Sequence, residues 1–110
     1  MELKPDDAEA HNNLGVALKK QGQIPEAAEH YYNALRLDPN YAAPHYNLGL
    51  AFFQFGKIMK AIYHFRKVLQ IDPTYKDARE NLEIAQKIQG RSKVGKVPIQ
   101  GSMKKDSQNL

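Results

Sequence analysis

The sequence predicts an all-α fold in which antiparallel helix pairs stack, with two full 34-residue repeats followed by a capping helix. Three observations lead to this fold class. The chain aligns with itself at an offset of 34 residues, apolar residues recur at spacings of three and four, and turn-forming residues separate the segments at matching positions. A chain of 110 residues has room for one small domain at most.

The internal repeat places residues 8–41 over residues 42–75 without a gap. Fourteen of the 34 aligned positions are identical, which chance does not explain. The identical pairs include His11/His45, Asn13/Asn47, Leu14/Leu48, Gly15/Gly49, Ala27/Ala61, His30/His64, Asp38/Asp72 and Pro39/Pro73. The two segments are therefore the first and the second repeat.

Each repeat is predicted to form two helices joined by a tight turn. The expected helices cover roughly residues 7–21, 24–37, 41–55 and 58–71. Gly22 and Gly56 fall between the paired helices, and glycine adopts the backbone conformations that such turns require. The paired helices are thus expected to be antiparallel.

An Asp-Pro pair closes each repeat. Pro39 and Pro73 cannot continue a helix, so each second helix is expected to end just before them. Asn40 and Thr74 come next, and both residue types are favoured as helix N-caps. We expect them to cap the helices that follow.

Small and bulky residues occupy equivalent positions in the two repeats. Gly15 and Gly49 are expected where paired helices approach closely, as are Ala27 and Ala61. The bulky counterparts, which are expected to fill the space between the helices, are Tyr31, Phe65, Leu35 and Leu69.

The ends of the chain depart from the full repeat. Residues 1–7 match the last residues of a repeat, so we expect the end of a partial preceding repeat and a piece cut from a longer array. Residues 76–90 match a first helix alone, and Glu83 stands where the full repeats have glycine, as suits a C-terminal capping helix with a polar outer face. Residues 91–110 show no period and predict a basic disordered tail or linker.

The repeated residues resemble a known family. They are similar to the tetratricopeptide repeat (TPR) at Leu14-Gly15, Ala27, Tyr31, Ala34 and Pro39 and at Leu48-Gly49, Ala61, Phe65, Val68 and Pro73. His11 and His45 stand where that pattern often has Trp, and Val68 replaces a preferred Ala. The resemblance covers residues 1–90 and implies a right-handed TPR solenoid, with first helices that line a concave groove, acting as a protein–protein interaction scaffold.

Nine residues are predicted to bind a peptide in this groove. They are Asn12, Asn13 and Val16 in the first repeat, Tyr46, Asn47, Leu50 and Phe53 in the second, and Asn81 and Ile84 in the capping helix. The aliphatic and aromatic members are expected to form pockets for side chains of the peptide.

An asparagine ladder, formed by Asn13, Asn47 and Asn81, recurs at intervals of 34 residues. Each side chain offers one acceptor and two donors, which match the groups of a peptide bond. Successive repeats are displaced by about 10 Å, and three residues of an extended chain span that distance at roughly 3.3 Å each. We therefore predict that the ladder holds the backbone of an extended segment of a protein or peptide partner.

Other interpretations of the ladder stay open. The amides can be solvated or can hydrogen-bond within the scaffold. The ladder is also similar to that in the repeat arm of O-linked N-acetylglucosamine transferases, where such asparagines hold peptide substrates. The alternative function is therefore a substrate-recruiting TPR arm excised from a larger enzyme such as a glycosyltransferase.

A carboxylate clamp, as in TPR co-chaperones that bind acidic chaperone termini, is not supported. The corresponding residues are Asn12, Val16, Asn47, Asp77 and Asn81, of which Asn47 alone fits. Asp77 and Glu80 would repel a terminal carboxylate.

Enzymatic, metal and cofactor functions lack support in the sequence. The chain has no cysteine, its three serines lie within residues 91–110, and no Gly-rich phosphate loop precedes a helix. The four histidines form two repeated pairs without accompanying carboxylates and are predicted to be packing residues: His11, His30, His45 and His64. We therefore predict no enzyme, no metal site and no cofactor.

The charge does not indicate a nucleic-acid partner. The formal net charge of +4 lies on residues 91–110, whereas residues 1–90 are neutral overall. The basic residues there lack aromatic neighbours for base stacking.

Location and assembly are predicted from the apolar pattern. The chain lacks an apolar run of about eighteen residues and a signal peptide, which predicts a cytoplasmic protein without a membrane span. Val16 and Leu18 belong to a face that a preceding helix would normally cover, which favours a homo-oligomer through exposed repeat ends.

Overall fold

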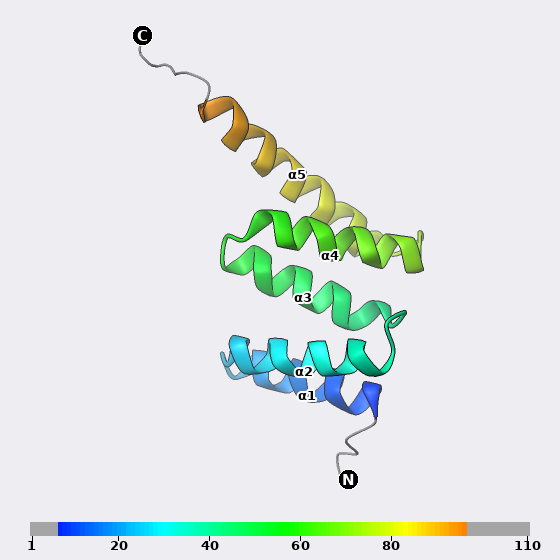
Figure 1. Ribbon diagram of the computed structural model, residues 1–110. Coiled ribbons are helices and arrows are strands. Elements are labelled where there is room, and N and C mark those ends of the chain that lie inside the picture. The colour runs from blue at the N-terminus through cyan, green and yellow to red at the C-terminus, as the bar shows by residue number, and fades with distance from the viewer. Residues whose placement is uncertain (1–6, 97–110) are drawn as a thin grey trace.

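The computed structural model describes residues 7–96 of the 110-residue chain, with side chains as far as Arg91. These residues form two helix pairs and one further helix (Figure 1). The helices are α1 (Ala8–Lys20), α2 (Ile24–Leu37), α3 (Ala42–Gln54), α4 (Ile58–Ile71) and α5 (Lys76–Lys96). The predicted all-α fold is confirmed, and the four helices of the full repeats begin and end within one residue of the expected positions.

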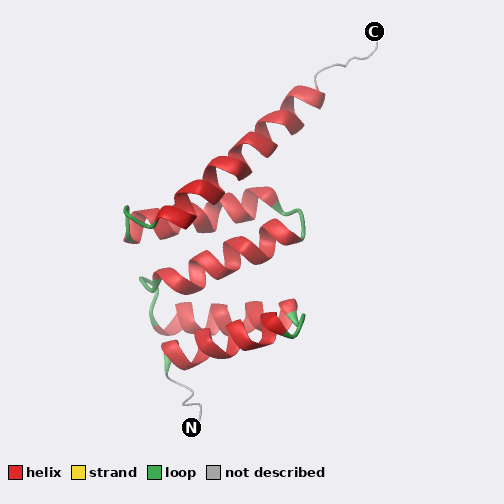
Figure 2. Ribbon diagram, turned by 180° about the vertical axis from the view of Figure 1, so that it is seen from behind, coloured by secondary structure: helices red, strands yellow, loops and turns green. Residues whose placement is uncertain are grey.

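The helices lie in two layers. Helix α1 packs against α2, α3 against α4, and α5 against α4, while α2 also contacts α3. Figure 1 looks onto α2 and α4, and the opposite view in Figure 2 brings α1 and α5 to the front. The first helices of successive units, α1, α3 and α5, therefore form one layer, and α2 and α4 form the outer layer.

Two glycines make the turns between paired helices. Gly22 and Gly56 have φ of 82° and 76°, in the left-handed region that strains any side chain. Their backbone N–H groups donate to the carbonyls of Lys19 and Phe53, at 2.9 and 3.0 Å. The predicted turn positions are confirmed.

The segment after each second helix is organised by an aspartate. The Asp38 carboxylate accepts from the backbone N–H of Asn40 at 3.2 Å, and that of Asp72 accepts from the N–H and the hydroxyl of Thr74 at 3.1 and 2.6 Å. These hydrogen bonds lower the pKa of Asp72. The prediction that Asn40 caps α3 was wrong: Tyr41 is the N-cap and makes no side-chain cap bond, while the Thr74 hydroxyl is engaged by Asp72.

The core of each unit depends on a glycine facing a large ring. A Cβ atom added to Gly15 would lie 2.5 Å from Tyr31 Cε1, and one added to Gly49 would lie 2.5 Å from Phe65 Cε1. Both rings are fully buried. The paired helices can approach this closely only because no side chain stands between the backbone and the ring, as predicted from the sequence.

The two rings differ in one atom of consequence. The Tyr31 hydroxyl is buried and has no hydrogen-bond partner among the described residues, and burial raises its pKa. An unpaired buried hydroxyl is unfavourable. The second unit avoids this cost because it has Phe65 at the equivalent position.

Helix α5 continues beyond its expected end. The sequence predicts a capping helix over residues 76–90 and a disordered tail from residue 91, whereas α5 runs to Lys96. Gly90 does not adopt a positive φ, and a glycine within a helix costs only about 1 kcal/mol, whereas the next proline is Pro98. The remainder of the predicted tail, residues 97–110, lies outside the described residues.

The predicted partial repeat over residues 1–7 lies outside the described residues except for Asp7. Asp7 is the N-cap of α1, and its carboxylate accepts from the backbone N–H of Ala10 at 3.1 Å. An acidic residue at this position satisfies a free N–H group and complements the helix dipole. This contact fixes where the first described helix begins.

Candidate functional site

The nine predicted peptide-binding residues all belong to the helices of the α1, α3 and α5 layer. Their surroundings differ from one repeat to the next. Asn13 and Ile84 are exposed, Asn12 is buried, and the other six are half-buried. The layer is therefore a mixed amide and apolar surface, and its three repeated asparagines are not equivalent.

Asn47 is tied to the preceding helix by a hydrogen bond. Its Nδ2 donates to Oδ1 of Asn12 at 3.1 Å, which joins α3 to α1. Asn12 is only 6% exposed, so the prediction that it contacts a peptide directly needs correction. It lies where the two first helices meet, and its amide oxygen holds the Asn47 side chain in place.

Asn81 makes the equivalent bond one repeat later. Its Nδ2 donates to the Tyr46 hydroxyl at 3.1 Å and to the Asp77 carbonyl at 3.0 Å. Tyr46 stands 34 residues after Asn12, so both bonds join a ladder asparagine to the same position of the preceding repeat. Sequence reasoning missed this pairing, although the polar groups at residues 12 and 46 were its signal.

The ladder amides keep different hydrogen-bonding capacity. An amide has two N–H donors and one acceptor oxygen. Asn47 uses one donor within the scaffold, whereas Asn81 uses both, and the side chain of Asn13 has no hydrogen bond within residues 7–91. Donors and acceptors for a ligand are thus concentrated on α1 and α3, and α5 offers an acceptor.

Apolar side chains lie beside the amides. Val16 is partly buried against the core, together with Leu18, while Leu50 and Phe53 are half-buried on α3. Ile84 is 48% exposed on α5. Val16 and Leu18 pack on the core with one side and stay partly exposed, and oligomerisation through this face stays a prediction.

The α5 end of this layer carries two carboxylates, Asp77 and Glu80, and two cationic residues, Lys76 and Arg79. Burial, and after it the nearby Asp77 carboxylate, raise the pKa of Tyr46 and of Tyr75, whose rings lie 5.1 Å apart. Glu80 is also exposed, and its carboxylate lies 3.9 Å from Nζ of Lys76. The Asp77 carboxylate, which makes no ion pair among the described residues, would repel a ligand carboxylate beside it.

Three models of one repeat family match the chain. One, described as TPR repeat, matches residues 17–56, and two, described as tetratricopeptide repeat, match residues 42–75 and 1–29. Together they span residues 1–75, which include all four helices of the two full repeats. The chain belongs to the tetratricopeptide repeat family.

TPR domains are typically non-catalytic modules that mediate protein–protein interaction. The described part of this TPR chain contains no group of three or more His, Asp or Glu side chains placed to hold a metal ion. Between residues 7 and 96, no helix is long and apolar enough to cross a membrane.

Two histidine pairs lie inside the TPR units, one between the helices of each pair. Nδ1 of His11 lies 3.1 Å from Nδ1 of His30, and Nδ1 of His45 lies 3.1 Å from Nδ1 of His64. The rings of each pair have centroids 5.3 and 5.4 Å apart. The histidines therefore pack between helices and pair through their ring nitrogens, as expected for residues of aromatic size with a polar tip.

The second pair has an assignable proton arrangement. Nε2 of His45 lies 3.4 Å from the Pro39 carbonyl oxygen, an acceptor only, so Nε2 carries the proton. In the neutral ring Nδ1 of His45 is then the acceptor, and Nδ1 of His64 donates to it. Burial, and then the neighbouring His45, lower the pKa of His64 to about 4.

Acidification is expected to destabilise this TPR domain through His64. The unfolded chain binds a proton at a pKa of about 6.5, whereas the folded chain keeps the ring neutral down to about 4. The unfolded state therefore binds more protons between these values, and stability falls as the pH is lowered from 6.5 to 4. Since the ring is not fully enclosed, we expect a loss of about 2 kcal/mol, measured by urea unfolding at pH 7.5 and 4.5.

The matched variant for this measurement is His64→Gln, which cannot titrate. It is expected to be less stable than the wild type at pH 7.5, because it loses the bond to His45, but to change less with pH. Equal pH dependence in the two proteins would contradict the assignment to His64. Asp72 does not confound the comparison, since its lowered pKa acts below this window.

Proposed function

We propose that the chain is a protein–protein interaction scaffold that binds an extended peptide segment of a partner along α1, α3 and α5. The observation that carries this proposal is the arrangement of Asn47. Its hydrogen bond to Asn12 orients the amide and leaves one N–H and the acceptor oxygen for a ligand. An oriented amide binds at lower entropic cost than a mobile one, because its rotamer is already fixed.

The scaffold bonds and the peptide role are compatible. Internal hydrogen bonding is one alternative role for the ladder asparagines. Asn81 fits this role best, because both of its N–H donors bond within the scaffold. Asn13 and Asn47 keep groups that can pair with a peptide backbone. We infer that backbone pairing centres on α1 and α3, with the apolar Leu50 and Phe53 beside it.

The repeat spacing supports an extended ligand. Neighbouring helices pack at about 8–10 Å, and an extended chain advances roughly 3.3 Å per residue. Backbone groups of every third residue would then meet successive asparagines. Such pairing gives affinity without selecting a sequence, so specificity would come from side chains that contact Val16, Leu50, Phe53 and Ile84.

The alternative, a substrate-recruiting arm of a larger enzyme such as a glycosyltransferase, would use the same groove. The two functions differ in what the bound segment is presented to. Because they use the same groove, they predict the same effects of groove variants on peptide binding. The same binding experiment applies to both.

Asn13→Ala is expected to weaken peptide binding with little change in stability, because the side chain is exposed and no hydrogen bond within the described residues is lost. The probe is a set of peptides of about twelve residues selected from a random display library, long enough to cross three repeats. We expect about a tenfold or greater rise in Kd and a stability change within about 0.5 kcal/mol.

Asn33→Ala on the outer layer is the matched control and should leave Kd unchanged. Asn47→Ala is expected to weaken binding more strongly, and also to destabilise the fold by about 1–2 kcal/mol because the buried Asn12 oxygen loses its donor. The proposal fails if no peptide is enriched, or if selected peptides bind the wild type and Asn13→Ala equally. N-methylation of alternate peptide bonds in a selected peptide should abolish binding if the backbone is the group recognised.

A further inference from the structure

The outer layer carries a second candidate surface on α4, away from the ladder. A hollow of about 370 Å³ lies between α4 and α5, and its lining includes Met59, Ile62, Tyr63, Arg66, Lys67 and Gln89. We call this the α4 hollow. Met59 is 72% exposed and Tyr63 is 55% exposed, so two large apolar side chains stand open to solvent beside it.

The charge around the α4 hollow is of one sign. Residues 57–71 contain four cationic residues, Lys57, Lys60, Arg66 and Lys67, and no carboxylate. Among the described residues, the single ion pair is on α5, so these cations are not neutralised by contact with an acidic side chain. The one residue that α5 contributes to the lining is the uncharged Gln89.

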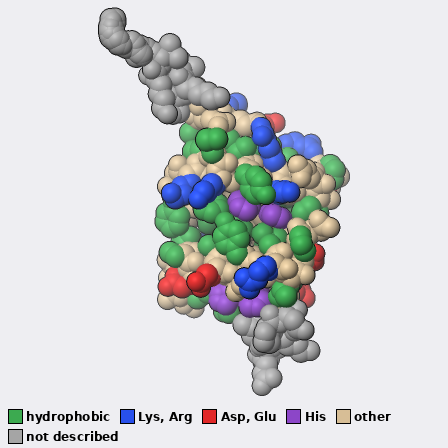
Figure 3. All heavy atoms as spheres, viewed as in Figure 1, with side chains coloured by type: hydrophobic (Ala, Val, Ile, Leu, Met, Phe, Trp, Pro, Cys, Tyr) green, Lys and Arg blue, Asp and Glu red, His purple; other side chains and the backbone are tan. Residues whose placement is uncertain are grey.

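Two of these cations lie over aromatic rings. Lys67 Nζ is 5.7 Å from the centroid of Tyr63, and Lys60 Nζ is 5.4 Å from that of Phe52. In Figure 3, which shows this face, Lys and Arg side chains gather beside hydrophobic ones in the upper part, where α4 lies. Positive charge and apolar surface thus alternate along α4 and at its contact with Phe52 of α3.

The first repeat shows that the fold does not require cationic and apolar side chains at this position. A smaller hollow of about 210 Å³ at the equivalent place on α2 is lined by Pro25, Glu26 and Glu29. These residues correspond to Met59, Lys60 and Tyr63. The same position of the repeat is therefore acidic on α2, and basic and apolar on α4.

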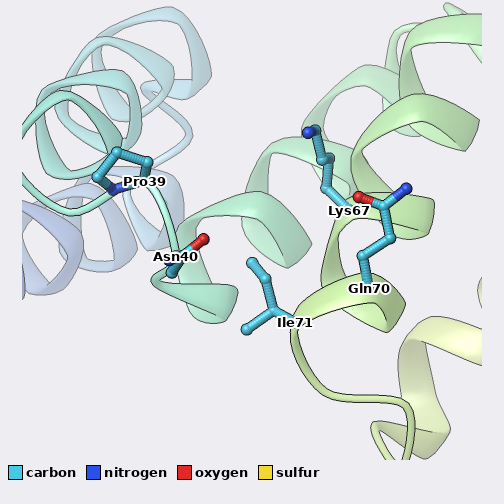
Figure 4. A pocket seen from close by; sticks show the side chains of 5 residues that line it. All are labelled: Pro39, Asn40, Lys67, Gln70 and Ile71. Carbon is cyan, nitrogen blue, oxygen red and sulfur yellow. The ribbon is translucent and has the colours of Figure 1, made fainter.

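The α4 surface extends toward the first repeat. A second hollow, of about 390 Å³, lies on the other side of Lys67 and Gln70, against Pro39 and Asn40 (Figure 4). Lys67 and Gln70 line both hollows and form the ridge between them. A ligand that lies across this ridge can contact both hollows and pass the Lys67 ammonium group.

We propose that the α4 hollow binds an acidic segment of a partner protein that carries an aromatic or aliphatic anchor residue. The cations complement carboxylates of the segment, and Met59, Ile62 and Tyr63 receive the anchor. A nucleic acid would also pair with the cations, but its successive bases stack on several aromatic rings, whereas this lining has one ring, Tyr63, beside the aliphatic Met59 and Ile62. A second copy of the chain would offer the two glutamates and the proline of α2, but the one large exposed ring beside them, Tyr32, already packs against His64 of its own chain, with 6.2 Å between the ring centroids.

The test uses the whole chain and a fluorescein-labelled synthetic peptide of about twelve residues, mostly Glu and Asp with one central Phe. Fluorescence anisotropy is expected to show binding that weakens as salt is added. Arg66→Glu with Lys67→Glu should raise Kd by about tenfold or more, as should Met59→Ser with Tyr63→Ser. Replacing the peptide Phe by Ser should weaken binding to a similar degree.

Control variants separate the alternatives. Glu26→Lys with Glu29→Lys changes the same number of charges at the equivalent place on α2 and should not weaken binding. Asn13→Ala should leave this binding unchanged, so failure here and failure of the ladder proposal are distinguishable. Should the charge-reversed protein unfold, Arg66→Gln with Lys67→Gln provides the neutral version of the test.

Several results would overturn the proposal. One is equal binding of a basic peptide of the same length, and another is peptide binding that is lost in Asn13→Ala. Tighter binding of a DNA duplex than of the peptide, lost on Arg66→Glu, would assign the surface to nucleic acid. Self-association in sedimentation equilibrium, abolished by Arg66→Glu with Lys67→Glu, would assign it to a second copy.

Discussion

Phe65→Ala is expected to lower the free energy of unfolding by about 4 kcal/mol, the largest effect of any single substitution considered for this chain. The ring is fully buried between α3 and α4, lies against Gly49, and has its centroid 6.0 Å from that of Tyr46. Its removal leaves a cavity that the backbone of two packed helices cannot close. A domain this small has a stability of about 5 kcal/mol, so the variant is expected to keep only about 1 kcal/mol and to have a measurable unfolded population.

Phe55→Ala is the matched control for this measurement. The Phe55 side chain is 55% exposed in the turn after α3, so the same atoms are deleted without creating a cavity. We expect a change within about 0.5 kcal/mol, compared by urea unfolding followed by circular dichroism. Similar losses in the two variants would contradict the placement of Phe65 in the core.

Gly49→Val is expected to destabilise the fold by about 3 kcal/mol through overpacking. An added Cβ would lie 2.5, 2.7 and 3.0 Å from Cε1, Cδ1 and Cζ of the Phe65 ring. That ring cannot retreat, because it is fully buried. The result is measured by thermal and urea unfolding, and the fold itself should be lost in part of the population at 25 °C.

Two further variants identify the cause of this loss. Gly90→Ala on α5, where a Cβ would meet nothing within 4 Å, should stabilise the helix by about 0.5–1 kcal/mol. Adding Phe65→Leu to Gly49→Val should recover part of the stability, because the clashing ring atoms are removed. If the stability lost in the double variant equals the sum of the losses in Gly49→Val and in Phe65→Leu, the clash with the ring does not explain why position 49 needs glycine.

The helix pairs could be predicted from the sequence because each depends on local and repeated signals. The predicted ranges 24–37 and 58–71 match α2 and α4 as observed, since Gly22 and Gly56 precede each helix and an Asp-Pro pair follows it. The end of α5 could not be placed in this way. The repeat pattern ends at residue 90, but no left-handed glycine or proline interrupts the chain before Lys96.

The candidate site could be predicted by its position but not by its bonds. The repeat placed Asn13, Asn47 and Asn81 on one layer, as observed. Which amide is exposed, and which is held by Asn12 or Tyr46, depends on how neighbouring helices approach. The three asparagines occupy equivalent positions of the repeat but have different hydrogen-bond partners and exposures.

The α4 hollow was missed for a different reason. Residues 1–90 are neutral overall, and this total conceals an α4 segment with four cations and no carboxylate. A charge balance taken helix by helix would have shown it. The exposure of Met59 and Tyr63 follows from the packing of α4 against α5 and needs the structure.

The bonds from Asn47 to Asn12 and from Asn81 to Tyr46 have a mechanical consequence for the array. Stability in a repeat protein is a sum of terms within units and terms between neighbours, and these two bonds belong to the second kind. A ligand that engages Asn47 acts on the joint between the first and second units. Under the proposed binding of a peptide to Asn47, occupancy would therefore be coupled to the angle between the two units, and bending the array would change the affinity for the peptide.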